Sequence, residues 1–139
     1  LLSSVKRRED AFLEAARALE MQVVAIVAKD DVIAFNDDEM RLLKSRLSPT
    51  VSVSWSDNNA RATMTHCARA GIRIPDDLAI AGSDGLRSET DDRMRITSVR
   101  APWAASAALA VDLLIRLIEG KEVPSQTVLP VSLVAGDSA

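Results

Sequence analysis

Few of the residues on which disulfides, metal sites and catalytic pairs depend are present in this sequence. Its 139 residues include one cysteine, one histidine and no tyrosine. A single cysteine excludes a disulfide within the chain and a zinc site built from several cysteines. Cys67 and His66 are neighbours within a predicted helix, so they point to different faces and are not expected to act as a pair. The low cysteine content is typical of a reducing compartment, and we expect the protein to be cytoplasmic.

Short motifs that carry enzyme chemistry are also missing. The sequence has no glycine-rich dinucleotide or phosphate loop, no nucleophile elbow and no histidine near a candidate nucleophile. We therefore expect a binding module that uses no cofactor. An enzyme on a similar sheet is the alternative, and turnover of a sugar or phosphosugar that Asp84→Ala abolishes would support it.

Charge and hydropathy patterning exclude two classes of partner. The formal net charge is −3, whereas a chain that binds a phosphate backbone needs a basic stripe. No cationic leader with an apolar centre opens the sequence, and no apolar run is long enough to cross a bilayer. These residues are therefore not expected to bind nucleic acid or a membrane by themselves.

What the sequence does contain is a regular alternation of apolar strand patterns and amphipathic helix patterns. With 47% hydrophobic and 27% charged residues, it fits one globular domain. Helices are predicted at 5–20, 36–47, 57–71 and 104–119, and strands or extended segments at 23–27, 50–55, 78–81, 96–102 and 126–134, the last interrupted at Pro130. This alternation predicts an α/β fold of three layers, in which a mostly parallel sheet carries helices on both faces.

Small polar or acidic residues follow three of the predicted strands. The apolar pair at positions 1 and 2 is interpreted as the end of the first of these strands. Because ligands bind at the carboxyl ends of parallel strands, we expect the polar residues to gather at one edge of the sheet, with Arg8 of the first helix aimed at it. A guanidinium that faces a carboxylate suits a neutral ligand with hydroxyl groups or ring nitrogens. In chain order these residues are Ser3 and Ser4, Ser56 and Asp57, and Ser83 and Asp84.

Each of the main candidates has a structural alternative. Ser4 and Asp57 are both placed to cap the helix that follows them. Asp84 precedes Gly85 and is compatible with an ordinary turn, although its place at the strand edge favours a ligand. Arg8 lies in a run of charges, which is typical of a solvated helix face.

Several stretches of the chain resemble successive signatures of the LacI/GalR family of bacterial transcription regulators. They are "SSVKRREDAF", "SDNNARATMTHCARAGIRIPDDLAIAGSDG", "ITSVRAP" and "LAVDLLIRLIEGKEV", followed by "VLPVSLVAGDS". The resemblance implies a two-lobed effector-binding module similar to periplasmic sugar-binding proteins. It assigns residues 1–100 to the C-terminal lobe, 101–121 to a crossover and a helix of the first lobe, and 122–139 to strands that return to the C-terminal lobe. The family's helix-turn-helix, hinge helix and most of its first lobe have no counterpart in these residues.

The same resemblance implies a binding site and a function. Arg8 and Asp84 fall on ligand-binding residues of the family, Ser4 matches a small hydroxyl residue near the pocket, and Ser56 stands where asparagine is usual. The implied function is to sense a small sugar-like or nucleobase-like effector as a homodimer, with operator DNA bound only through the helix-turn-helix. A periplasmic-type sugar-binding protein is an alternative. An interaction domain with no effector also stays open, because the chain departs from the family pattern at Ala62, Ser83, Met94-Arg95 and Ala101.

Two further predictions concern large apolar side chains. Trp55 and Trp103 are predicted to lie in the core or at a lobe boundary, and direct stacking on a ligand is the alternative. The helix at 104–119 is apolar around most of its circumference, so it needs to be buried on more than one side. We expect it to fold back on its own sheet or to dock against a second copy, and a monomer with this helix disordered is the alternative. The family's own dimer contacts would involve residues 57–70 and the loop after Asp84.

Overall fold

The computed structural model describes residues 3–25, 37–45, 48–86 and 94–139. Its strands form one sheet in the order β1-β2-β3-β4. The first three pair in parallel and the last pairs antiparallel to β3. The mostly parallel sheet predicted from the sequence is therefore confirmed. The strands are β1 (Val51–Val53), β2 (Ala79–Asp84), β3 (Thr97–Arg100) and β4 (Ser132–Val134).

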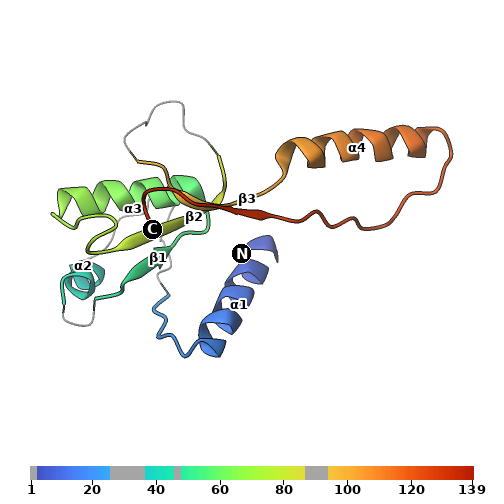
Figure 1. The fold of residues 1–139 in the computed structure, drawn as a ribbon. Coiled ribbons are helices and arrows are strands. Elements are labelled where there is room, and N and C mark those ends of the chain that lie inside the picture. Colours follow the sequence, from blue (N-terminus) through green and yellow to red (C-terminus); the bar gives the residue numbers. More distant parts are fainter. Residues whose placement is uncertain (1–2, 26–36, 46–47, 87–93) are drawn as a thin grey trace.

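Helices lie on both sides of this sheet. Figure 1 shows α3 (Asp57–Arg69) above the strands, and α1 (Ser3–Ala18) and α2 (Asp37–Leu43) below them. α3 connects β1 to its parallel neighbour β2 and packs on β2. Gly71 follows α3 with a φ of +74°, a conformation that glycine adopts without steric cost. This arrangement confirms the three layers that the alternation of strand and helix patterns predicted.

The hydrophobic core lies where α3 meets the sheet. Ala60, Thr63 and Cys67 of α3 are buried because a spacing of three or four residues brings them to one face of the helix. Leu78 and Ile80 meet this face from the sheet side, and both are almost completely buried. The cluster of buried apolar residues consists of Leu43, Ala60, Cys67, Leu78, Ile80 and Ile96.

Two predicted strands are not found where the sequence pattern placed them. Residues 23–25 of the predicted strand at 23–27 are exposed and irregular, and the other two residues lie outside the described ranges. In the segment at 126–134, only Ser132–Val134 forms a strand. An apolar run becomes a strand only when a neighbouring strand accepts its backbone hydrogen bonds, and the pattern does not specify that neighbour. The strand end predicted at positions 1 and 2 also lies outside the described ranges.

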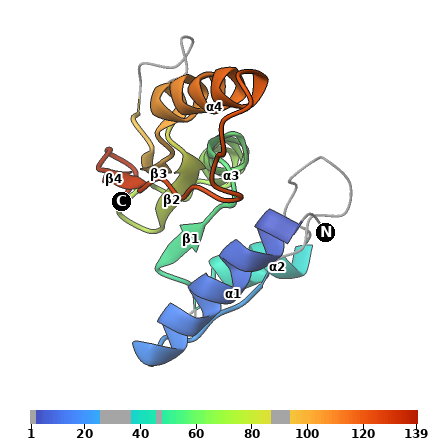
Figure 2. The ribbon, with the colours of Figure 1, turned by 90° about the vertical axis from the view of Figure 1, so that its right-hand side faces the viewer.

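The last third of the chain leaves the sheet and returns to it. α4 (Trp103–Ile118) follows β3, and residues 119–131 lead back to β4. Figures 1 and 2 show α4 projecting on the far side of the sheet from α1 and α2. No residue of α4 is buried, so the expected fold-back onto its own sheet is wrong. No helix in the described ranges is long and apolar enough to span a membrane.

Candidate functional site

Arg8 is carried by α1 to the carboxyl ends of β1 and β2. Its Nη1 donates hydrogen bonds to the carbonyl oxygen of Trp55 at 2.9 Å and to Oγ of Ser83 at 3.2 Å. Its guanidinium carbon lies 6.0 Å from the centroid of the Trp55 ring. Arg8 therefore bridges the ends of two strands, which a purely solvated helix face would not do. Its side chain is still 44% exposed, so part of the guanidinium is open to a ligand.

Asp84 is the last residue of β2 and lies beside Arg8. Its Oδ1 is 4.0 Å from Nη1 of Arg8, which makes a long ion pair. Burial raises the pKa of Asp84 and the nearby Asp57 carboxylate raises it further, whereas Arg8 lowers it. Its φ of +114° is unusual for a residue with a side chain. The carbonyl oxygen of Asp84 accepts a hydrogen bond from Nε1 of Trp103 at 2.9 Å, which ties the start of α4 to the strand end.

Asp57, the first residue of α3, connects the segments around the site. It is 3% exposed, and its carboxylate accepts hydrogen bonds from Oγ of Ser98 at 2.5 Å and from the backbone N–H of Leu86 at 2.8 Å. Gly82 of β2 permits this position, because a Cβ at residue 82 would collide with Oδ1 of Asp57. The carboxylate thus joins α3, β3 and the segment that follows Asp84.

The two serine candidates have different outcomes. Ser56 is buried, and its Oγ accepts a hydrogen bond from the backbone N–H of Asn59, so it is the N-cap of α3. The cap was predicted one residue later, at Asp57, and that assignment is wrong. Ser4 lies in the first turn of α1, and its side chain is outside what the structure describes.

Residues 2–139 match the family model of the periplasmic binding protein-like domain. The chain belongs to this family. Among curated proteins, it is 30% identical over 100 residues to the sucrose operon repressor of Streptococcus mutans, covering 72% of this chain and 31% of the repressor. It is 26% identical over 95 residues to the lactose operon repressor of Escherichia coli, covering 68% of this chain and 26% of the repressor. The resemblance to LacI/GalR regulators is thereby confirmed.

Solved structures agree with the fold of this periplasmic binding protein-like domain. A LacI family transcriptional regulator from Lactobacillus casei, determined with bound sucrose, matches with a TM-score of 0.71 at 24% identity. The match covers 96% of this chain and 51% of that structure. The chain thus spans about a third or less of these curated relatives and about half of this solved regulator.

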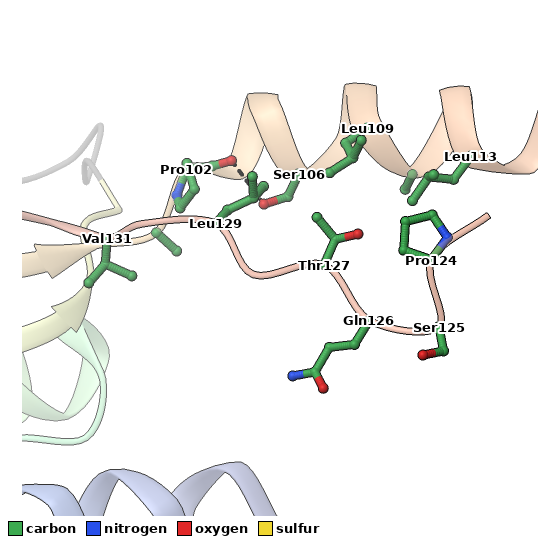
Figure 3. A pocket seen from close by; sticks show the side chains of 12 residues that line it. Pro102, Ser106, Leu109, Leu113, Pro124, Ser125, Gln126, Thr127, Leu129 and Val131 are labelled. Carbon is green, nitrogen blue, oxygen red and sulfur yellow. Dashed lines mark hydrogen bonds between the residues drawn. The ribbon is translucent and has the colours of Figure 1, made fainter.

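A groove of the domain lies away from Arg8 and Asp84, along α4. Its volume is about 470 Å³, and α4 and the returning segment line it. Figure 3 shows Leu109 and Leu113 of α4 facing Pro124, Thr127 and Leu129 of that segment. The groove carries none of the predicted site residues. We locate the candidate site at the strand ends because the charged and hydrogen-bonded groups converge there.

The sequence analysis missed several residues that shape this edge of the domain. Trp55 and Trp103 were predicted to be core or lobe-boundary side chains. Each is 53% exposed and lies beside the Arg8 and Asp84 pair, so the core position is wrong and the lobe boundary stays a prediction. The only signal was their position, directly after a strand end and directly after the crossover. Within the described residues, no three His, Cys, Asp or Glu side chains lie close enough together to hold a metal ion.

Proposed function

We propose that this chain is the effector-sensing and dimerising part of a LacI-family bacterial transcriptional regulator. In this proposal a small sugar binds at the ends of β1 and β2, contacted by Arg8 and Asp84. The domain binds and does not catalyse, and it acts in the cytoplasm. Operator DNA would be bound by a helix-turn-helix that these residues do not include.

The observation that carries the proposal is the convergence of Arg8 of α1 with Ser83 and Asp84 at the end of β2. A forked donor and a carboxylate acceptor lie side by side at the strand edge, and both side chains are partly exposed. Each hydroxyl of a sugar needs a fixed donor or acceptor, and this pair supplies one of each. The names of the relatives support a sugar over a nucleobase, since they are repressors of sucrose and lactose operons.

The test is effector binding by protein expressed from the complete gene, measured by calorimetry against a panel of glucose, galactose, sucrose and free nucleobases. For the tightest sugar, Arg8→Ala and Asp84→Asn should each cost about 1–3 kcal/mol, or about five- to 150-fold in affinity. Asn is chosen at position 84 because it tolerates a positive φ better than Ala does.

Arg7→Ala is the matched control, because Arg7 is the exposed neighbour of Arg8 in the same charge run. Its affinity should equal that of the wild type. Unchanged affinity in both Arg8→Ala and Asp84→Asn would end the site assignment. Binding of a nucleobase and of no sugar would end the choice of effector class.

We also infer that residues 101–121 belong to a different lobe from residues 1–100 and 122–139. The exposed apolar surface of α4 supports this, because large side chains left in water forgo roughly 1.5–3 kcal/mol each. A homodimer is the proposed assembly. Light scattering tests the homodimer and should report a dimer at micromolar concentration. Amide exchange tests the lobe assignment and should be slower through residues 109–118 in the complete gene product than in this 139-residue chain.

A further inference from the structure

Both tryptophans of this chain lie at the proposed site. The sequence has only two Trp, two Phe and no Tyr, so half of its aromatic residues meet at one edge of the sheet. Each indole is 53% exposed. Leaving such large apolar rings in water forgoes much of the stabilisation that their burial would supply. Rings placed this way beside charged groups are typical of a ligand-binding wall, which combines apolar surface with a few polar contacts.

The two tryptophans are held differently. Trp103 is anchored by its ring, because Nε1 donates to the carbonyl oxygen of Asp84. Trp55 is anchored by its main chain, because its carbonyl oxygen accepts from Arg8 while the guanidinium lies 6.0 Å from the ring centroid. A cation at this distance from an indole is within the range of a cation–π attraction. Arg8 therefore braces Trp55 and leaves more than half of its surface open.

We propose that Trp55 determines specificity by packing its indole against the C–H face of a pyranose ring. This rests on the proposed function, in which Arg8 and Asp84 bind the hydroxyl groups at the rim of the sugar. Hydrogen bonds to the hydroxyl groups at the rim leave the apolar C–H face of the pyranose in contact with water. A flat apolar surface is needed to remove that face from water. Trp55 supplies that surface next to the Arg8 side chain. An acyclic polyol offers the same hydroxyl groups but has no ring face.

The test measures affinity by calorimetry for the tightest sugar of the panel and for sorbitol, with protein expressed from the complete gene. The variants are Trp55→Phe, which keeps an aromatic face, and Trp55→Leu, which keeps apolar bulk without a flat ring. Trp55→Leu should weaken binding of the sugar by about tenfold or more, whereas Trp55→Phe should stay within about threefold of the wild type. Sorbitol should bind weakly to the wild type and to both variants. The ratio of the affinity for the sugar to the affinity for sorbitol should therefore fall only in Trp55→Leu.

The variants also separate this inference from the proposed function. If Arg8→Ala and Asp84→Asn weaken sugar binding but Trp55→Leu does not, the site stands and the role of Trp55 is overturned. Equal losses of sugar affinity in Trp55→Phe and Trp55→Leu would also overturn the role of Trp55, because an aromatic ring at this position would then give no advantage in binding. A wild-type protein that binds none of the sugars would overturn the proposed function itself.

Discussion

The less hydrophobic of two similar helices is the buried one. α3 carries mostly polar residues, yet Asp57, Ala60, Thr63 and Cys67 are buried against the sheet. α4 is dominated by Leu, Ile, Val and Ala, yet none of its residues is buried. Burial is therefore decided by whether a complementary surface lies beside the helix, and composition alone does not reveal it.

The two helices begin differently, although they end alike. Gly71 follows α3 and Gly120 follows α4, each with a positive φ. Ser56 caps the start of α3 through its side chain. α4 begins after Pro102 without a side-chain hydrogen bond at its cap. α3 is thus specified by local sequence signals and by packing, whereas α4 has helix-forming residues but few contacts that hold it in place.

Replacing one leucine in the core beside α3 and one in α4 should give the largest difference in the free energy of unfolding. Leu78 is 1% exposed and Leu114 of α4 is 56% exposed. Leu78→Ala should lower the free energy of unfolding by about 2–5 kcal/mol, because it removes buried methyl groups and leaves a cavity. In this 139-residue chain, Leu114→Ala should change it by less than about 0.5 kcal/mol. Urea denaturation measures the free energy of unfolding of both variants. A loss in Leu114→Ala as large as that in Leu78→Ala would mean that α4 is covered in solution.

Removing one carboxylate from α3 and one from α4 should give a smaller difference in stability. Asp57 is buried and accepts hydrogen bonds from Ser98 and from the backbone of Leu86. Asp57→Ala leaves both donors without their partner, so it should cost about 1–3 kcal/mol of stability. Asp112 of α4 is exposed, and Asp112→Ala should stay within about 0.5 kcal/mol of the wild type. Equal thermal shifts in the two variants would show that the Asp57 network does not stabilise the fold.

Periodicity and strand edges were sufficient to predict much of this fold. The helices of α1, α3 and α4 and the parallel strands around α3 follow from local patterns, and so does the meeting of Arg8 with Asp84 at one edge. The sequence could not reveal that residues 23–25 stay outside the sheet or where α4 lies, because both depend on surfaces distant in the chain. The same is true of Asp57, whose partners Leu86 and Ser98 are 29 and 41 residues away.

Trp55 shows a related limit. A tryptophan that follows a strand is as compatible with the core as with a binding wall, and its exposure beside Arg8 separates the two. Ser56 shows the opposite case. Its position before a helix is a sufficient reason for a capping role, whether or not it also contacts a ligand.

Serines near the start of each helix sharpen the comparison further. Ser56→Ala should lower the free energy of unfolding by about 1 kcal/mol, because the backbone N–H of Asn59 loses its acceptor. Ser106 of α4 donates to the carbonyl oxygen of Pro102, a bond that adds little to a helix. Ser106→Ala should therefore be nearly neutral. Ser56→Asp should restore most of the loss, and a Ser56→Ala protein as stable as the wild type would contradict the capping role.

The smallest expected effect concerns the segment that joins α3 to β2. Arg73 donates to both carboxylate oxygens of Asp77 at 2.7 and 2.9 Å, and its backbone N–H donates as well. These bonds lower the pKa of Asp77 from its ordinary value of 3.8 to about 2. Because the folded pKa is depressed, the stabilising contribution is present above pH 3.8 and is lost as pH falls toward 2. Both side chains are well exposed, so the effect on stability is small and the titration itself is the useful readout.

Carbon-detected NMR of the Asp77 carboxyl measures that titration directly. In Arg73→Ala the pKa of Asp77 should rise toward 3.8, because the hydrogen bonds from the guanidinium and its charge are lost. Arg116→Ala is the matched control in α4, where the guanidinium donates to the carbonyl oxygen of Glu122 at 3.4 Å, and it should leave the pKa of Asp77 unchanged. A wild-type Asp77 that already titrates near 3.8 would show that the hydrogen bonds from Arg73 to Asp77 do not persist in solution.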